Sequence, residues 1–170
     1  GIEGQESIVS KPIEEAVRKA HAVFYETRTP RPPQTHEGDI GDKKGTLEKI
    51  KEHLGSQTEV WTIYNHPVTN PRALAKKQLL NEDLQMGLNA LDGVLKSQLN
   101  DQYCQSIALS ARPAYLALTE CVVPGQKDAN EKRKFIEGVG DIQSILELSQ
   151  VNAFVDKLKL NIVGDYKAKI

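Results

Sequence analysis

The sequence lacks an excess of charge of either sign. Its 170 residues include 22 Lys and Arg against 23 Asp and Glu, which gives a formal net charge of −1 at pH 7. A protein that binds nucleic acid or an anionic membrane through its general charge needs a basic surplus, because it must neutralise phosphate groups. The balanced charge therefore argues against nucleic acid as a partner.

The sequence also lacks a long hydrophobic run and an initial methionine. Its longest uncharged stretch, residues 60–71, has 12 residues and contains two prolines, whereas a membrane-spanning helix needs about 20 apolar residues in a row. We therefore expect a soluble chain without a membrane span. The chain begins with Gly1 and its only methionine is Met86. We expect a processed chain, whose missing start leaves the cellular location unknown.

Cysteine is scarce. Cys104 and Cys121 are too few for a disulfide-rich scaffold and form no Cys-x-x-Cys motif. In one straight helix they would lie ~25 Å apart and could not bond. Their midpoint falls at Arg112–Pro113, where a proline can end a helix and let the chain double back. Two interpretations stay open: a disulfide, which would indicate a secreted or cell-surface protein, or two buried reduced thiols.

Motifs for catalysis, metals and cofactors are absent. The histidines are spaced so that no two could share a metal on one helix face; they are His21, His36, His53 and His66. The sequence contains neither a Gly-x-Ser-x-Gly elbow nor a phosphate-binding P-loop. We therefore predict no catalytic residues of a known motif, no metal and no cofactor, which argues against an enzyme.

Helical periodicity dominates what is present. Apolar residues recur at spacings of three and four in five segments, at about 11–28, 46–54, 71–99, 103–118 and 128–162. The pattern over 71–99 fits either a single helix or two helices joined near Asn81. Asp128 and Glu131 resemble a capping box that opens the last segment, and a register offset near Ser149 predicts a break there. Such stripes must pack against one another. The sequence thus predicts an all-α antiparallel bundle of about five to six helices, forming one domain over 1–170 with tails at 1–9 and 165–170.

Residues 58–64 do not fit this pattern. Their β-branched and aromatic side chains favour a strand by propensity. Since no second convincing strand is visible, we expect either a short extended segment laid on helices or a helix that propensity misjudges.

Residues 30–45 form the longest irregular stretch, rich in proline, then in glycine and acidic residues. Loops of this length in compact domains are uncommon and are often functional. The candidate binding residues of this loop are Arg31, Pro32, Pro33, His36 and Asp39.

Three hypotheses of function follow. The leading one is a non-catalytic interaction or assembly module, which contacts another protein or a second copy through its helix faces and the 30–45 loop. The alternative is a carrier that holds an apolar small molecule between helices, in room left by small residues. These residues are Gly87, Gly93, Ala108, Ala111, Ala114 and Ala117. The third is an enzyme whose site assembles only in space, for instance from Tyr64, His66 and a distant carboxylate.

Overall fold

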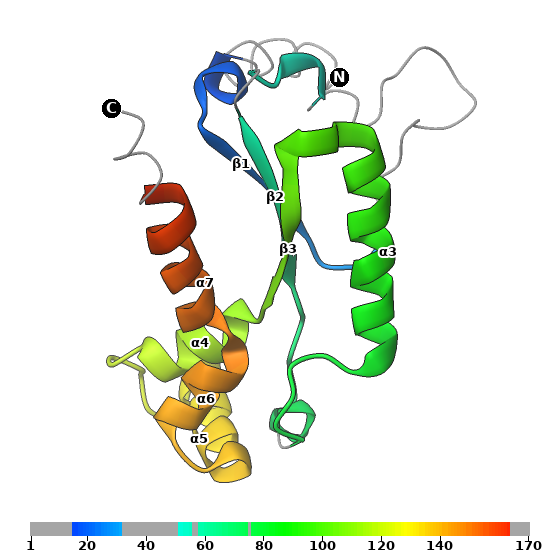
Figure 1. Ribbon diagram of the computed structural model, residues 1–170. Coiled ribbons are helices and arrows are strands. Elements are labelled where there is room, and N and C mark those ends of the chain that lie inside the picture. The colour runs from blue at the N-terminus through cyan, green and yellow to red at the C-terminus, as the bar shows by residue number, and fades with distance from the viewer. Residues whose placement is uncertain (1–14, 32–50, 56–57, 75, 164–170) are drawn as a thin grey trace, which may run out of the picture.

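A computed structural model describes residues 15–31, 51–55, 58–74 and 76–163. Within them, three parallel strands form a sheet in the order β1-β2-β3 (Figure 1). The strands are β1 (Ala22–Thr27), β2 (Glu59–Asn65) and β3 (Tyr103–Leu109). The prediction of an all-α antiparallel bundle is therefore wrong, and the protein is a mixed α/β structure.

Two of the three strands lie in segments predicted to be helical. Short apolar runs fit a strand or a helix equally well, so their pattern does not distinguish the two. β1 lies inside the predicted helix 11–28, of which only 15–19 is helical among the described residues. β3 occupies the first half of the predicted helix 103–118. The strand propensity of 58–64 is confirmed by β2.

Strand register decides which side chains share a face of the sheet. Ala22 pairs with Glu59 and Phe24 with Trp61, while Ile63 pairs with Ile107 across a ladder that is irregular between Val60 and Thr62. Side chains alternate between the faces of a strand. Val60, Thr62 and Tyr64 therefore share one face, and Trp61 and Ile63 lie on the other.

Helix α3 (Glu82–Leu99) connects β2 to β3 and covers the first of these faces (Figure 1). Its start is capped by Asn81, whose Oδ1 accepts a hydrogen bond of 2.9 Å from the Leu84 N–H. The predicted leucine seam is buried against the sheet, in a core cluster of Leu88, Leu91, Leu95, Leu99, Val60, Tyr64 and Tyr103. The predicted division of 71–99 near Asn81 is confirmed, since α3 begins directly after this residue, whereas 71–73 forms only a 3-10 turn.

A group of helices follows β3. They are α4 (Ala111–Leu118), α5 (Lys127–Val139), α6 (Ile142–Ser149) and α7 (Val151–Lys157), which continues as a π-helical turn over Leu158–Val163. Phe135, Ile145 and Leu116 are fully buried in the core of this group. The predicted break near Ser149 is confirmed, since α6 ends there and Gln150 has a left-handed backbone with φ of 61°.

Helix α7 lies on the face of the sheet opposite α3 (Figure 1). The ring of Phe154 meets the ring of Phe24 edge to face, with centroids 6.0 Å apart. No helix within the described residues is long and apolar enough to cross a bilayer. The predicted tails at 1–9 and 165–170 lie outside the described residues.

Two glycines of α3 provide a test of this packing. A Cβ at the exposed Gly93 would meet nothing within 4 Å, and alanine is favoured over glycine inside a helix by about 0.5–1 kcal/mol. We expect Gly93→Ala to raise the free energy of unfolding by about this amount in urea titrations. A Cβ at Gly87 would lie 3.0 Å from the Pro30 carbonyl oxygen, so Gly87→Ala should bring no such gain. Equal gains in both variants would contradict the close approach of α3 to Pro30.

Candidate functional site

The Tyr64–His66 pair proposed from the sequence does form. The Tyr64 hydroxyl lies 2.9 Å from His66 Nδ1, and the Ser110 hydroxyl donates to the His66 carbonyl oxygen at 2.7 Å. Burial lowers the pKa of the His66 imidazole and raises the pKa of the Tyr64 hydroxyl. Within the described part of the chain, no hydrogen bond joins a carboxylate to the Tyr64 hydroxyl or the His66 imidazole.

The carboxyl ends of the strands, where parallel sheets commonly bind ligands, are closed by Asn65. Its Oδ1 accepts a hydrogen bond of 3.1 Å from the Ala111 N–H at the start of α4. Its Nδ2 donates to Glu26 Oε1 at 3.0 Å. A side chain of the protein thus already occupies the first donor that this helix could offer to an anion.

Asp92 links α3 to the sheet. It accepts hydrogen bonds from the Tyr103 hydroxyl at 2.6 Å and from the Ser106 hydroxyl at 3.0 Å. Burial and the bond to Asp92 hold the pKa of Tyr103 well above its usual value. Because both carboxylate oxygens are engaged, this network positions α3 and leaves no oxygen of Asp92 without a partner.

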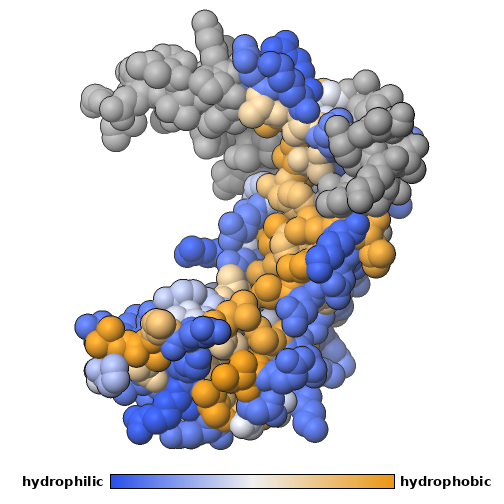
Figure 2. Space-filling model, turned by 90° about the vertical axis from the view of Figure 1, so that its left-hand side faces the viewer, coloured by the Kyte–Doolittle hydropathy of each residue, from blue (hydrophilic) through white to orange (hydrophobic). Residues whose placement is uncertain are grey.

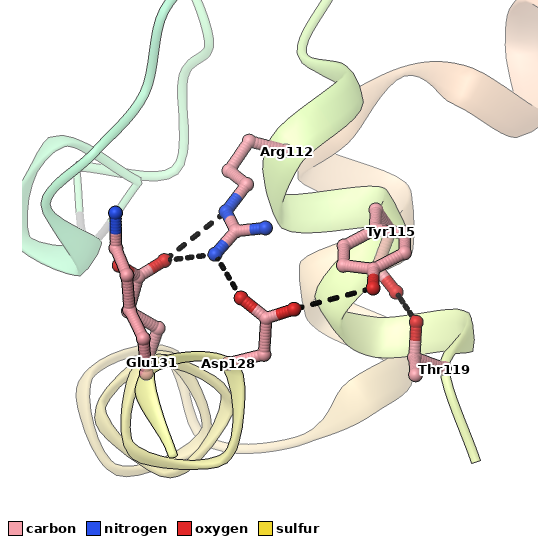
Figure 3. Close-up of polar contacts among 6 residues, drawn as sticks. Arg112, Tyr115, Thr119, Asp128 and Glu131 are labelled. Carbon is pink, nitrogen blue, oxygen red and sulfur yellow. Dashed lines mark hydrogen bonds and ion pairs between the residues drawn. The ribbon is translucent and has the colours of Figure 1, made fainter. Parts of the chain in front are cut away.

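Arg112 ties α4 to α5 (Figure 3). Its guanidinium donates to Asp128 Oδ1 at 2.6 Å and to Glu131 Oε2 at 2.5 Å, and Tyr115 donates to the other oxygen of Asp128. The Arg112 bond holds the pKa of Asp128 below its usual range. The predicted capping box is therefore wrong: α5 starts without a side-chain cap, since Asp128 and Glu131 turn to the arginine.

A groove opens beside β3, and we take it as the candidate functional site. Two adjoining cavities of about 410 and 420 Å³ make it up, and they share Lys77, Leu148 and Gln150. The first cavity is lined by the segment before α3, by β3 and by α7. Its remaining lining residues are Gln78, Leu79, Leu80, Ser106, Ile107, Ala108, Ala153 and Lys157.

Within the described residues, the outer edge of β3, which lines this groove, has no neighbouring strand. Leu109 directs its carbonyl oxygen toward β2, where it accepts from the His66 N–H at 2.8 Å. Alternate residues of a strand direct their backbone polar groups to opposite sides, so Ser106 and Ala108 direct theirs away from β2. Among the described residues these groups have no backbone partner. Ser110, in the same alternation, donates its N–H to the Ser149 carbonyl oxygen at 2.9 Å.

Two residues of the groove have unusual backbone conformations. Lys77 has φ of 55° and Gln150 has φ of 61°, in the left-handed region that residues other than glycine rarely adopt. Both line both cavities. Backbone strain of this kind is common at functional sites, which agrees with the choice of the groove.

The groove also carries unpaired positive charge. Within the described residues, neither Lys77 nor Lys157 has an ion-pair partner. Glu147 lines the second cavity only, and its Oε1 accepts from Gln143 Nε2 at 3.0 Å. The first cavity thus combines two ammonium groups with an apolar lining and a strand edge.

Of the loop residues predicted to bind, only Arg31 is described. It is exposed and lies in a bend after β1, where its N–H donates to the Thr29 carbonyl oxygen at 2.8 Å. The other predicted loop residues lie outside the described residues; they are Pro32, Pro33, His36 and Asp39.

Both cysteines are free and exposed. Helix α4 runs through Arg112–Pro113 without a break, so the reversal of the chain that was to bring Cys104 and Cys121 together is absent. Although Cys104 is exposed as a residue, partial burial of its thiol and the neighbouring charge of Glu59 raise its pKa to about 11.

Sequence reasoning missed the groove, although two signals pointed to it. Lys77 interrupts the apolar seam that leads into α3, and the register offset near Ser149 marks the α6–α7 junction at Gln150. Neither signal reveals that β3 lines the same cavity as Lys77 and Gln150. Among the described residues, no cluster of His, Cys, Asp and Glu could hold a metal ion.

Comparison with known protein families, curated proteins and solved structures found no significant match to this chain.

The His66 environment predicts a pH dependence of stability. Burial lowers the pKa of the folded imidazole below its ordinary 6.5. At pH values between the pKa of the folded protein and 6.5, the unfolded chain therefore binds more protons than the folded protein. We expect the free energy of unfolding to fall as the pH decreases below 6.5. In His66→Gln this part of the dependence, measured by urea unfolding at a series of pH values, should be lost. Tyr64→Phe should keep it, since burial is the cause; an unchanged profile in His66→Gln would contradict the assignment.

Proposed function

We propose that this protein is a non-catalytic interaction module that holds a segment of another polypeptide in the groove beside β3. The observation that carries the proposal is the outer edge of β3 at Ser106 and Ala108, which lines an open cavity and has no neighbouring strand within the described residues. An exposed row of backbone donors and acceptors is a template for pairing with another chain. The helix-face contacts expected from the sequence would come from α6 and α7.

The carrier hypothesis has less support. A pocket for an apolar ligand is largely enclosed and apolar, whereas both cavities of the groove open to solvent and include lysine and glutamine side chains. Of the small residues expected to leave room between helices, Ala108 lines the first cavity. The others line neither cavity; they are Gly87, Gly93, Ala111, Ala114 and Ala117. Gly87 instead permits the close approach of Pro30.

An enzyme also has less support than an interaction module. In the described part of the chain, the polar clusters around Asp92, Asn65 and Arg112 are satisfied by internal hydrogen bonds. Catalytic groups need access to a substrate and a displaced pKa suited to proton transfer. His66 has a displaced pKa, but it does not line the groove.

The surface offers a further feature suited to binding. Figure 2, which views the molecule from the side that carries α7, shows hydrophobic side chains in a band from the sheet down to the helices. Apolar residues with large exposed fractions include Leu160 at 73% and Leu118 at 60%. Exposed apolar patches commonly mark contact surfaces.

Blocking the groove tests the proposal. Ala153 is exposed on α7 and lines the first cavity, so Ala153→Trp should fill the cavity without disturbing the core. Ala90 is exposed on α3 and outside the groove, so Ala90→Trp is the matched control. Peptides selected by the wild-type protein from a displayed random library should bind Ala90→Trp equally and Ala153→Trp at least about tenfold more weakly in titrations. Equal binding to both variants, or no selected peptide, would contradict the proposal.

A further inference from the structure

We infer that the bound segment is extended, pairs with β3 as an added strand, and carries acidic side chains that meet Lys77 and Lys157. This inference rests on the proposed function and specifies its ligand. The binding mode and the charge of the segment follow from separate features of the groove.

The backbone of β3 specifies the binding mode. Leu109 directs its backbone groups toward β2. Since the direction alternates along a strand, Ser106 and Ala108 direct their two N–H and two C=O groups to the other side, which is the side of the groove. Donors and acceptors that alternate at the spacing of a strand match only another extended backbone. A helical segment has already used its own N–H and C=O groups and could not satisfy them.

The fold also closes one end of the pairing edge. The N–H of Ser110, which would continue the row, already donates to the Ser149 carbonyl oxygen. An added strand therefore pairs along Ser106 and Ala108 and must leave β3 where α6 meets α7. The side chains that it directs toward α7 then pass Ala153 and Lys157, which line this cavity.

The charges specify the side chains of the ligand. Lys77 and Lys157 line the first cavity from two different elements, one in the segment before α3 and the other at the end of α7. The carboxylate of Asp92 already accepts hydrogen bonds from the hydroxyls of Ser106 and Tyr103. Carboxylates on an inserted strand would thus meet ammonium groups that have no partner within the described residues.

Nucleic acid fits the groove less well than an acidic peptide does. The outward carbonyl oxygens of Ser106 and Ala108 repel phosphate, while Leu79, Leu80 and Ile107 supply an apolar lining. Two lysines would also neutralise few phosphates of a strand. An oligonucleotide therefore serves as a competing probe in the test.

The test uses fluorescence anisotropy with synthetic peptides as long as β3, which has 7 residues. One peptide alternates Val and Glu, and its control alternates Val and Lys. We expect the Glu peptide to bind at least about tenfold more tightly. N-methylation of those alternate residues whose N–H groups pair with β3 should weaken binding of the Glu peptide by a similar factor. N-methylation of the residues in between, whose N–H groups point away from β3, should be tolerated.

Charge reversal in the protein completes the test. The double variant Lys77→Glu/Lys157→Glu should prefer the Lys peptide, whereas Lys76→Glu, which alters an exposed lysine outside the groove, should keep the wild-type preference. Equal binding of both peptides, indifference to N-methylation at both sets of alternate residues, or tighter binding of oligo-dT than of the Glu peptide would overturn the inference. If library peptides still lose binding in Ala153→Trp when the Glu peptide fails, the proposed function stands and only its ligand class is wrong.

Discussion

The structure depends on the pairing of β2 along both of its edges. Thr62 and Tyr64 of this strand are 0% and 2% exposed, and Trp61 on the opposite face is 5% exposed. A strand buried on both faces and paired on both sides has one register, because a slip of one residue would move every side chain to the wrong face. This register places Asn65 beside Glu26 and Ala111. Within the described residues it leaves the outer edges of β1 and β3 without a neighbouring strand.

The parts of the fold that depend on neighbours in sequence could be predicted. The leucine seam from Leu88 to Leu99 and the break near Ser149 follow from local periodicity, and both are confirmed. The sheet could not be predicted, because β2 pairs with segments about 40 residues away on either side and each strand is too short for its pattern to exclude a helix. Asp128 and Glu131 show the same limit: as a local pair they resemble a cap, but Arg112 from another helix engages both.

The candidate site was harder to predict than the fold. The polar residues that attract attention in the sequence, Tyr64 and His66, are in contact with each other but do not line the groove. In the described part of the chain, no buried side-chain polar atom lacks a partner, as expected when an unsatisfied group costs about 1–3 kcal/mol. The groups that stay available for a ligand are backbone atoms of β3 and two lysines, and a backbone edge has no signature in sequence. Only the positions of Lys77 and Ser149 hinted at it.

The same two lysines also bear on self-association, the other kind of partner that the sequence suggests. If two copies paired through their β3 edges, Lys77 and Lys157 of each copy would face those of the other. Like charges opposite each other in a sheet oppose pairing, and lysine at an exposed edge is a common means of preventing it. The charge that favours an acidic ligand thus opposes a second copy at the same edge. Self-association would have to use another surface, such as the part of the hydrophobic band on the α7 side that lies outside the groove (Figure 2).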